Sequence, residues 1–456
     1  MRSGRMRFSL TLMATCVAAA GGARLAAQAG RISYDTFALA NGLRVIYSED
    51  HSTPIVSVDV WYNTGSRNER PGHSGFAHLF EHMMFQGSGH VKKSEHLQLV
   101  ERAGGNVNGS TTEERTNFFE TVPSNRLNLA LWLEADRMRS LAITQANFEN
   151  QRQTVKEERR LNVDNQPYAA AFQDGTTWPF DSTACFPYSH TVIGSMDDLD
   201  SAKVADVQAF FDTYYAPNNA TITVVGDFQP AELQRLVTQY FGAIPRHAAA
   251  APVTCNWKLG PGPRTVSVSD AHANLPASIR FYRIPQHSDA DTPALELLNV
   301  ILGQGESSRL NVSVVRHDTA AVQVGSFVPS VRRGPGVFVV FGISNQGVPI
   351  ERVDTLLAAQ VDSIRAHGVS VDELAKAKNT ARAGFVHGRE TTIDKAEELH
   401  HYDLFHGSIA EINTDLDALR AVSVEDIRRV AAKYLDSANV VVVFVKPAAA
   451  RSGGGQ

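Results

Sequence analysis

Two histidines and a glutamate stand in a spacing that suits metal-assisted hydrolysis: His78, Glu81 and His82 form the pattern His-x-x-Glu-His. On a helix, residues four apart lie one above the other, so the two imidazoles can share one tetrahedral zinc ion. The glutamate then stands beside the metal, where it can take a proton from a zinc-bound water. The order is the reverse of the commoner His-Glu-x-x-His arrangement. The alternative is an amphipathic helix whose histidines belong to the core or the surface.

A zinc ion with two histidines and an open water position needs a third protein ligand. A helix predicted over residues 148–163 offers Glu158, which shares one face with Phe148 and Val155. A carboxylate on a partly apolar face needs a partner, and a metal ion would supply one. Glu157 is turned about 100° away from that face and is the second choice. Alternatively, both glutamates belong to a solvated run of charges.

The elements that position these residues follow from periodicity. The alternating stretch 54–62 predicts a strand, and the Gly- and Ser-rich residues 63–74 form a loop that leads into the His-x-x-Glu-His helix. Residues 93–104 predict a further helix, and residues 106–122 predict two strands. Strand, loop and helix in this order give the helix of the pattern a fixed support.

The chain has 456 residues, 43% hydrophobic and 20% charged, with a net charge of −5. These values describe a globular protein of about two to four domains, and the mildly acidic balance argues against a nucleic-acid partner. Residues 1–29 predict a cleaved signal peptide, because arginines precede the apolar run 8–20 and Ala27-Gln28-Ala29 suits cleavage. The run is too short for a membrane span, so we expect an exported, periplasmic protein. A retained anchor is the alternative.

Cys185 and Cys255 remain after the signal peptide is removed. Export permits a disulfide, but two cysteines far apart in sequence define no disulfide framework. We therefore expect unpaired structural thiols, with a disulfide as the alternative.

A second group of histidines lies in the segment 397–402 and at His406. These residues suggest another metal site, but a helical segment of this kind is more typical of a domain surface or an interdomain contact. We predict such a surface or contact here.

The chain also repeats itself. Residues 204–214 and the strand after them match residues 424–434 and their strand, with Asn219 corresponding to Asn439 at an offset of 220 residues. Such a repeat predicts two copies of one α+β unit, and a chance helix-to-strand resemblance is the alternative. At the same offset from the His-x-x-Glu-His pattern stands the segment 298–302, which has no metal ligand. Only the first copy is therefore expected to do chemistry.

Domain boundaries follow from the repeat and from the Ala-, Pro- and Gly-rich stretch between its copies. The expected segments are the signal peptide (1–29), a zinc-bearing domain (30–246), a linker (247–263), a homologous domain without the metal motif (264–448) and a disordered tail (449–456).

Several motifs together resemble the pitrilysin, insulin-degrading-enzyme and mitochondrial-processing-peptidase superfamily of zinc metallopeptidases. The resemblance covers nearly the whole chain after the signal peptide. It is carried by Gly72-x-Ser-Gly-x-x-His-x-x-Glu-His82, Gly104-Gly-x-x-Asn108, Val155-x-x-Glu-Arg159, Pro187-Tyr-Ser-His190, Tyr214-Tyr-x-Pro-Asn-Asn219 and Gly303-x-Gly-x-Ser-Ser-Arg-Leu310.

This resemblance implies an α+β fold of two homologous α/β sandwich domains, which form half of a clamshell around a chamber completed by a second chain. It implies one Zn²⁺ per chain, held by His78, His82 and Glu158. It also implies that the strand with Asn108, Gly109 and Ser110 aligns an extended peptide through main-chain hydrogen bonds. An ordinary paired strand is the alternative for that segment.

Two departures from the family pattern matter. Gln151 stands where members often have a second acid, which leaves the metal affinity in question. Active members use an arginine and a tyrosine seven residues apart in the second copy, and this chain has Arg316 followed by Gln323. We expect a paralogue to supply the arginine-tyrosine pair in a heterodimer, while a homodimer that uses Arg316 alone is the competing interpretation.

The sequence thus predicts an exported zinc endopeptidase that acts on peptides or unfolded segments, with Glu81 as the base. The alternative from another class is a non-catalytic assembly subunit of the same fold. A chamber that captures peptides without rapid cleavage is a further alternative, because the tyrosine is missing.

Overall fold

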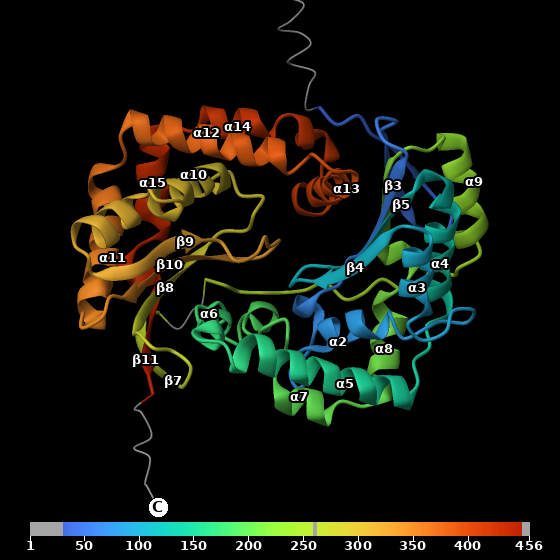
Figure 1. Cartoon of the computed structure of the whole chain (residues 1–456), viewed down its shortest axis with the longest axis horizontal. Coiled ribbons are helices and arrows are strands. Elements are labelled where there is room, and N and C mark those ends of the chain that lie inside the picture. Colours follow the sequence, from blue (N-terminus) through green and yellow to red (C-terminus); the bar gives the residue numbers. More distant parts are fainter. Residues whose placement is uncertain (1–30, 259–261, 449–456) are drawn as a thin grey trace, which may run out of the picture.

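The structure is a computed structural model that describes residues 31–258 and 262–448. The expected signal peptide, 1–29, and the expected tail, 449–456, lie outside the described residues. The strands form two separate sheets, and helices pack on both of them (Figure 1). The α+β prediction is therefore confirmed. Within the described ranges, no helix is both long and apolar enough to cross a membrane.

The first sheet has six strands in the order β1-β2-β6-β3-β5-β4. β3 is an interior strand, because it pairs with β5 on one side and with β6 on the other. Its alternate residues, from Val56 to Tyr62, point to one face and pack into a core with the helices of the same half. The strands are β1 (Asp35–Ala38), β2 (Arg44–Glu49), β3 (Ile55–Tyr62), β4 (Asn106–Thr111), β5 (Thr116–Pro123) and β6 (Ala220–Gly226). The helices are α2 (Phe76–Met83), α3 (Glu95–Arg102), α4 (Leu127–Ser140), α5 (Gln145–Arg159), α6 (Ala169–Gly175), α7 (Met196–Ser201), α8 (Val204–Tyr214) and α9 (Pro230–Phe241).

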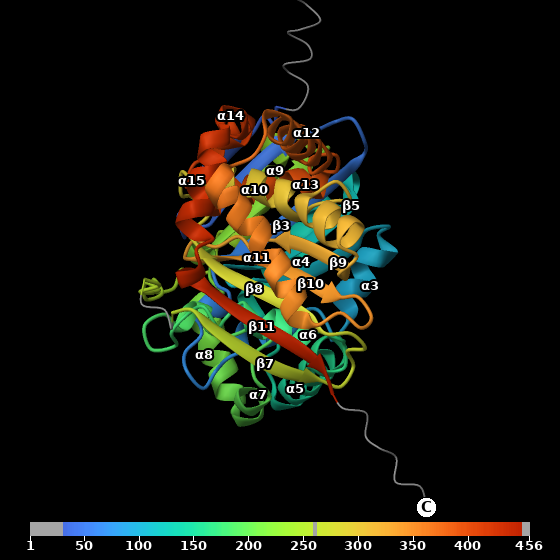
Figure 2. The same cartoon turned by 90° about the vertical axis from the view of Figure 1, so that its left-hand side faces the viewer.

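The second sheet has the order β7-β11-β8-β10-β9, and α10, α11 and α15 cover its outer face (Figure 2). Its strands are β7 (Arg264–Asp270), β8 (Ala277–Ile284), β9 (Ala321–Phe327), β10 (Gly336–Ser344) and β11 (Val440–Pro447). Its helices are α10 (Thr292–Gly303), α11 (Ile350–His367), α12 (Val371–His387), α13 (Thr392–His401), α14 (Asp415–Ala421) and α15 (Val424–Tyr434).

The repeat seen in the sequence is a repeat of topology. Apart from β1, the two sheets have the same strand order and directions, with β2 parallel to β6 and β7 parallel to β11. The turns between helix and strand are also alike. Asn219 donates a hydrogen bond to the carbonyl oxygen of Tyr214 at 2.8 Å, and Asn439 donates one to that of Tyr434 at 2.7 Å. The matching asparagines therefore have the same role in both copies: each hydrogen-bonds to the end of the preceding helix.

In each half, one helical segment packs against the sheet of the other half (Figure 1). α13 packs on the face of the first sheet that the first core leaves free, with Thr392 hydrogen-bonded to Ser57 of β3 at 2.7 Å. α6 packs on the inner face of the second sheet. Its last residue, Gly175, lies against the Phe281 ring so closely that a β-carbon there would overlap the ring. The inner faces of both sheets are thus covered by exchange.

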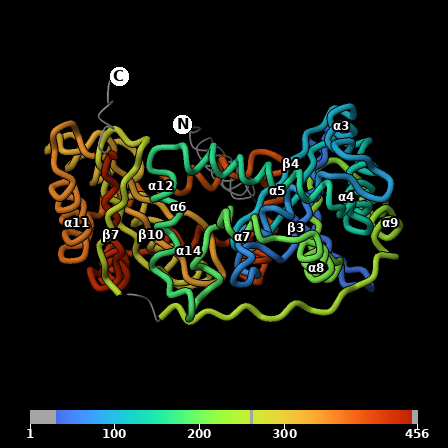
Figure 3. Tube along the Cα trace, turned by 90° about the horizontal axis from the view of Figure 1, so that it is seen from below, coloured from blue at the N-terminus to red at the C-terminus, as the bar shows by residue number. Residues whose placement is uncertain are grey.

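The exchange also joins the two cysteines, and the prediction of unpaired thiols is wrong: Cys185 and Cys255 form a disulfide. Cys185 is fully buried on the inner face of the second sheet, shortly after α6. Figure 3 shows the segment between α9 and β7 running extended along one side of the molecule, and this path carries Cys255 past the same core. The pairing depends on the long-range exchange and therefore left no local sequence signal.

Candidate metal centre

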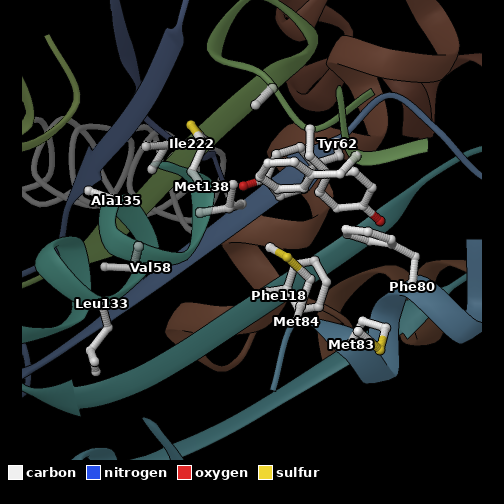
Figure 4. Packing of buried hydrophobic residues seen from close by; sticks show 14 of the residues in the cluster. Val58, Tyr62, Phe80, Met83, Met84, Phe118, Leu133, Ala135, Met138 and Ile222 are labelled. Carbon is white, nitrogen blue, oxygen red and sulfur yellow. The ribbon is translucent and has the colours of Figure 1, made fainter. Parts of the chain in front are cut away.

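Helix α2 is held by its apolar side, which leaves its other side for chemistry. Phe80 and Met83 are buried, and Figure 4 shows them in one cluster with Tyr62 and Phe118 of the first sheet. Burial of a side chain such as Phe contributes about 1.5–3 kcal/mol to folding. The two histidines of the pattern, one turn apart, lie on the half-buried side of the helix.

The start of α2 is closed by a carboxylate from outside the helix. Its N-cap, Gly75, has a φ of 92° and no side chain that could cap the helix. The buried Glu69 accepts hydrogen bonds from the backbone N–H groups of Gly75, at 2.9 Å, and Ala77, at 2.7 Å. Nε2 of His190 hydrogen-bonds to Oε2 of this carboxylate at 3.0 Å. A negative charge at a helix N-terminus is stabilising, so Glu69 and His190 fix the helix that carries the pattern.

His78, His82 and Glu158 form one cluster between the neighbouring helices α2 and α5. The Nε2 atom of His82 lies 3.1 Å from Oε2 of Glu158, and Nε2 of His78 lies 3.6 Å from Oε1. Ligand atoms about 2.0–2.1 Å from a tetrahedral zinc ion are roughly 3.3 Å from one another. Two imidazoles and a carboxylate at these separations fit zinc in both chemistry and spacing.

The two candidate glutamates of α5 lie in different surroundings. Phe148 and Val155 are buried on the side of α5 that carries Glu158 to the histidines. Glu157 is exposed, and its carboxylate pairs with Arg160 one turn later. The cluster therefore contains Glu158 and excludes Glu157.

The pKa values of the two histidines are shifted in opposite directions. Burial, together with the neighbouring His82, lowers the pKa of His78 to about 4. Burial also opposes protonation of His82, but the hydrogen bond to Glu158 and the charges of Glu158 and Glu81 raise its pKa above the ordinary value. The same hydrogen bond lowers the pKa of Glu158. The first histidine is thus ready to bind a metal, while the second must give up a proton.

Glu81 stands beside the cluster and is held by the first sheet. Thr111, at the end of β4, donates a hydrogen bond to Oε2 of Glu81 at 2.6 Å. Burial raises the pKa of Glu81, and the Thr111 hydrogen bond acts in the opposite direction. A carboxylate with a raised pKa is better able to accept a proton near neutral pH. Sequence analysis missed Thr111, although it ends the strand that begins with the Gly-Gly-x-x-Asn motif.

The strand predicted to align a peptide is the outermost strand of the first sheet. β4 pairs with β5 on one side, and no described strand pairs with its other side. Asn108 is exposed on this edge, and Gly109 lies against the Phe118 ring. The Ser110 side chain is engaged within the sheet, where it donates to Asn117 at 2.8 Å. The free edge leads directly to Thr111 and hence to Glu81.

The remaining predicted residues lie in different places. Gln151 is buried on α5, where its side chain helps to raise the pKa of His82, so it lies beside the cluster. Arg316 lies in the second half, in the π-helical segment Asn311–His317, and its guanidinium pairs with Glu306 at 2.6 Å. Gln323 is exposed on the edge strand β9. The structure therefore does not place Arg316 in the cluster of its own chain.

The fold and the cluster together define a duplicated α+β protein with one metallopeptidase-like centre, and comparison with known proteins agrees. Residues 44–176 match the family described as Insulinase (Peptidase family M16). Residues 201–381 match the Peptidase M16 inactive domain, which is consistent with the absence of metal ligands from the segment 298–302 of the second half.

The relatives extend over almost the whole chain. This chain is 31% identical over 431 residues to the Helicobacter pylori protein named zinc protease PqqE, and the matched region covers 93% of this chain and 96% of the relative. A solved protease from Helicobacter pylori superimposes with a TM-score of 0.85 at 29% identity, covering 91% of this chain and 100% of that one. A probable mitochondrial-processing peptidase subunit beta from Arabidopsis thaliana is 23% identical, covering 90% and 77%. The chain belongs to peptidase family M16.

Proposed function

We propose that this chain is an exported zinc-dependent endopeptidase that hydrolyses peptides or unfolded polypeptide segments. The observation that carries the proposal is the convergence of His78, His82 and Glu158, with the carboxylate of Glu81 beside them. Relatives named zinc proteases support the identity of the metal, and we expect one zinc ion per chain at this centre.

The residues divide the reaction between them. When bound, zinc supplies a Lewis acid that polarises the peptide carbonyl and acidifies water. Glu81 accepts the proton of the attacking water and can return it to the leaving amine. Thr111 holds the carboxylate of Glu81 in position. The free edge of β4, with Asn108, Gly109 and Ser110, aligns the substrate backbone as an added strand.

We further propose two duplicated domains, 30–246 and 264–448, joined by the linker 247–263. The chain forms half of a dimeric chamber, whose other half is a paralogue or a second copy. The exposure of Arg316, 54% of its side chain, leaves it available to a facing chain, and Gln323 places a glutamine amide where active members have a tyrosine hydroxyl. This is why a paralogue with an arginine-tyrosine pair is the favoured partner. The residues 1–29 support export to the periplasm.

The function is tested by purifying the mature chain, alone and with the paralogue, and measuring zinc and the hydrolysis of a mixed peptide library. We expect zinc in the chain alone and full peptidase activity only in the mixture. Full activity of the chain alone, unchanged by the paralogue, would make the partner proposal wrong. Peptides that are retained but not cut by either preparation would favour the capturing chamber instead.

Replacing Thr111 with valine should lower kcat about tenfold, because loss of one hydrogen bond to a charged group costs roughly 1.5 kcal/mol. Zinc content and KM should stay unchanged. The hydrogen bond lowers the pKa of Glu81, so its loss should move the acid limb of the pH-rate profile to higher pH. Thr111→Ser, which keeps the hydroxyl, should restore both kcat and the profile; an unaltered profile in Thr111→Val would refute this role.

The zinc affinity should fall as the pH falls, with a slope of one decade per pH unit. His82, whose pKa is raised above 6.5, must release a proton to bind metal, so protons compete with zinc below that pKa. His78, with a pKa of about 4, is already neutral in this range, and Glu158 is already ionised. Competition with a chromophoric chelator between pH about 5 and about 6.5 measures the slope. A slope of two would mean that both histidines are protonated in the free chain.

A further inference from the structure

A second cluster of histidines lies where α13 reaches from the second half to the first sheet. α13 lies between the two sheets (Figure 1), and its residue His400 is buried, stacked on Trp61 of β3 with ring centroids 4.8 Å apart. The His400 side chain thus lies in a contact between the two halves. The next residue, His401, is turned about 100° around the helix, and its ring lies against His287 of the second half.

Three imidazoles meet at this point: His287, His401 and His406. The Nε2 atoms of His287 and His401 are 3.1 Å apart, and each of the three side chains offers a ligand atom within 4.8 Å of the others. The ring centroids are 5.0 to 5.5 Å apart. Nitrogen atoms bound to a tetrahedral zinc ion are about 3.3 Å apart, so the separation of the first pair already suits a shared ion.

The third imidazole has the surroundings of a metal ligand. Nδ1 of His406 donates to the carboxylate of Glu411 at 2.8 Å, which fixes the tautomer with a lone pair on Nε2. That Nε2 atom is buried and has no hydrogen-bond partner among the described residues. A buried acceptor without a partner is costly, and a metal ion would satisfy it. A carboxylate behind a histidine is also the usual arrangement around bound zinc.

One of the three histidines, His287, lines a small cavity. This cavity, of about 120 Å³, reaches His287 from the side of Thr292 and Val331.

We propose that His287, His401 and His406 bind a second divalent transition-metal ion of the zinc class at the junction of the two halves. Three imidazoles are a donor set suited to zinc, nickel or copper rather than to calcium or magnesium. The site is separate from the His78, His82 and Glu158 cluster and does not depend on the proposed peptidase activity. The competing interpretation is a metal-free hydrogen bond between His287 and His401.

An ion at this place would join the covering helix of the first sheet to the body of the second half. His287 follows β8, and its backbone N–H donates to the carbonyl oxygen of Arg332 at 2.9 Å. Arg332 pairs with Glu113 in the turn between β4 and β5. The metal therefore lies at a junction that also supports the free strand edge of β4. We expect its role to be to stabilise the arrangement of the halves.

The test counts zinc in the full mature chain after treatment with a chelator, reloading with zinc and gel filtration. We expect two zinc ions per chain in wild type, one in His82→Ala, one in His401→Ala and none in the double variant. Zinc should raise the Tm of His82→Ala but not that of the double variant. His387→Ala, which removes an exposed histidine with 74% of its side chain accessible, is the matched control and should keep both ions.

The outcomes separate this site from the proposed peptidase centre. If His401→Ala holds as much zinc as wild type, the junction site does not exist. If wild type holds one ion that is lost in His401→Ala but kept in His82→Ala, the junction site stands and the peptidase centre fails. Glu411→Gln, which alters no ligand, should weaken zinc binding in the His82→Ala background about 10- to 100-fold. A His82→Ala chain that binds neither zinc nor, by visible absorption, Co²⁺ would overturn the proposal.

Discussion

Replacing Glu81 with glutamine is expected to lower kcat by about 100-fold or more while the zinc content stays at the wild-type level. An amide cannot accept a proton from water, so the variant loses the base. Its oxygen can still accept the hydrogen bond from Thr111, which now holds Glu81 at 2.6 Å, so the side chain keeps its place. Glu81 does not belong to the cluster of His78, His82 and Glu158, and the metal should remain.

This prediction is checked by steady-state hydrolysis of a peptide library and by metal analysis of the same preparation. Glu101→Gln, which alters an exposed carboxylate on α3, is the matched control and should leave both quantities unchanged. A Glu81→Gln chain that keeps most of its activity would show that another group is the base. A chain that loses its zinc would show that Glu81 is a ligand.

The parts of the site that follow from local spacing could be predicted from the sequence. His78 and His82 are four positions apart, so any helix places them together, and the same periodicity distinguished Glu158 from Glu157 on α5. The repeat at an offset of 220 residues likewise anticipated two sheets of one topology. Periodicity and repeats are patterns within the sequence itself, which is why one sequence suffices to detect them.

The parts that depend on contacts between distant segments could not be predicted. Glu69 closes the N-terminus of α2 through a bent loop, and Thr111 reaches Glu81 from a strand that lies 30 residues later. The exchange of α6 and α13 between the halves leaves no periodic signal, and the disulfide of Cys185 depends on that exchange. In each case the partner is chosen by the packing of the whole fold.

Replacing Glu158 with glutamine is expected to remove most of the zinc from the proposed centre of His78, His82 and Glu158. A neutral amide is a poor zinc ligand compared with a carboxylate, and the change also removes the charge that raises the pKa of His82. The activity should fall with the metal content, and excess zinc should restore part of it. Glu157→Gln is the matched control, because Glu157 is its neighbour on the same helix and pairs with Arg160 instead.

Metal analysis after gel filtration, with zinc titrations of both variants, measures the effect. The comparison is best made in the His401→Ala background, so that an ion at the junction does not hide the loss. If Glu158→Gln keeps the zinc content of wild type, the carboxylate is not a ligand and its 3.1 Å approach to His82 is only a hydrogen bond. If Glu157→Gln loses the metal instead, the helix must turn on zinc binding, because in the described structure Glu157 is exposed and pairs with Arg160.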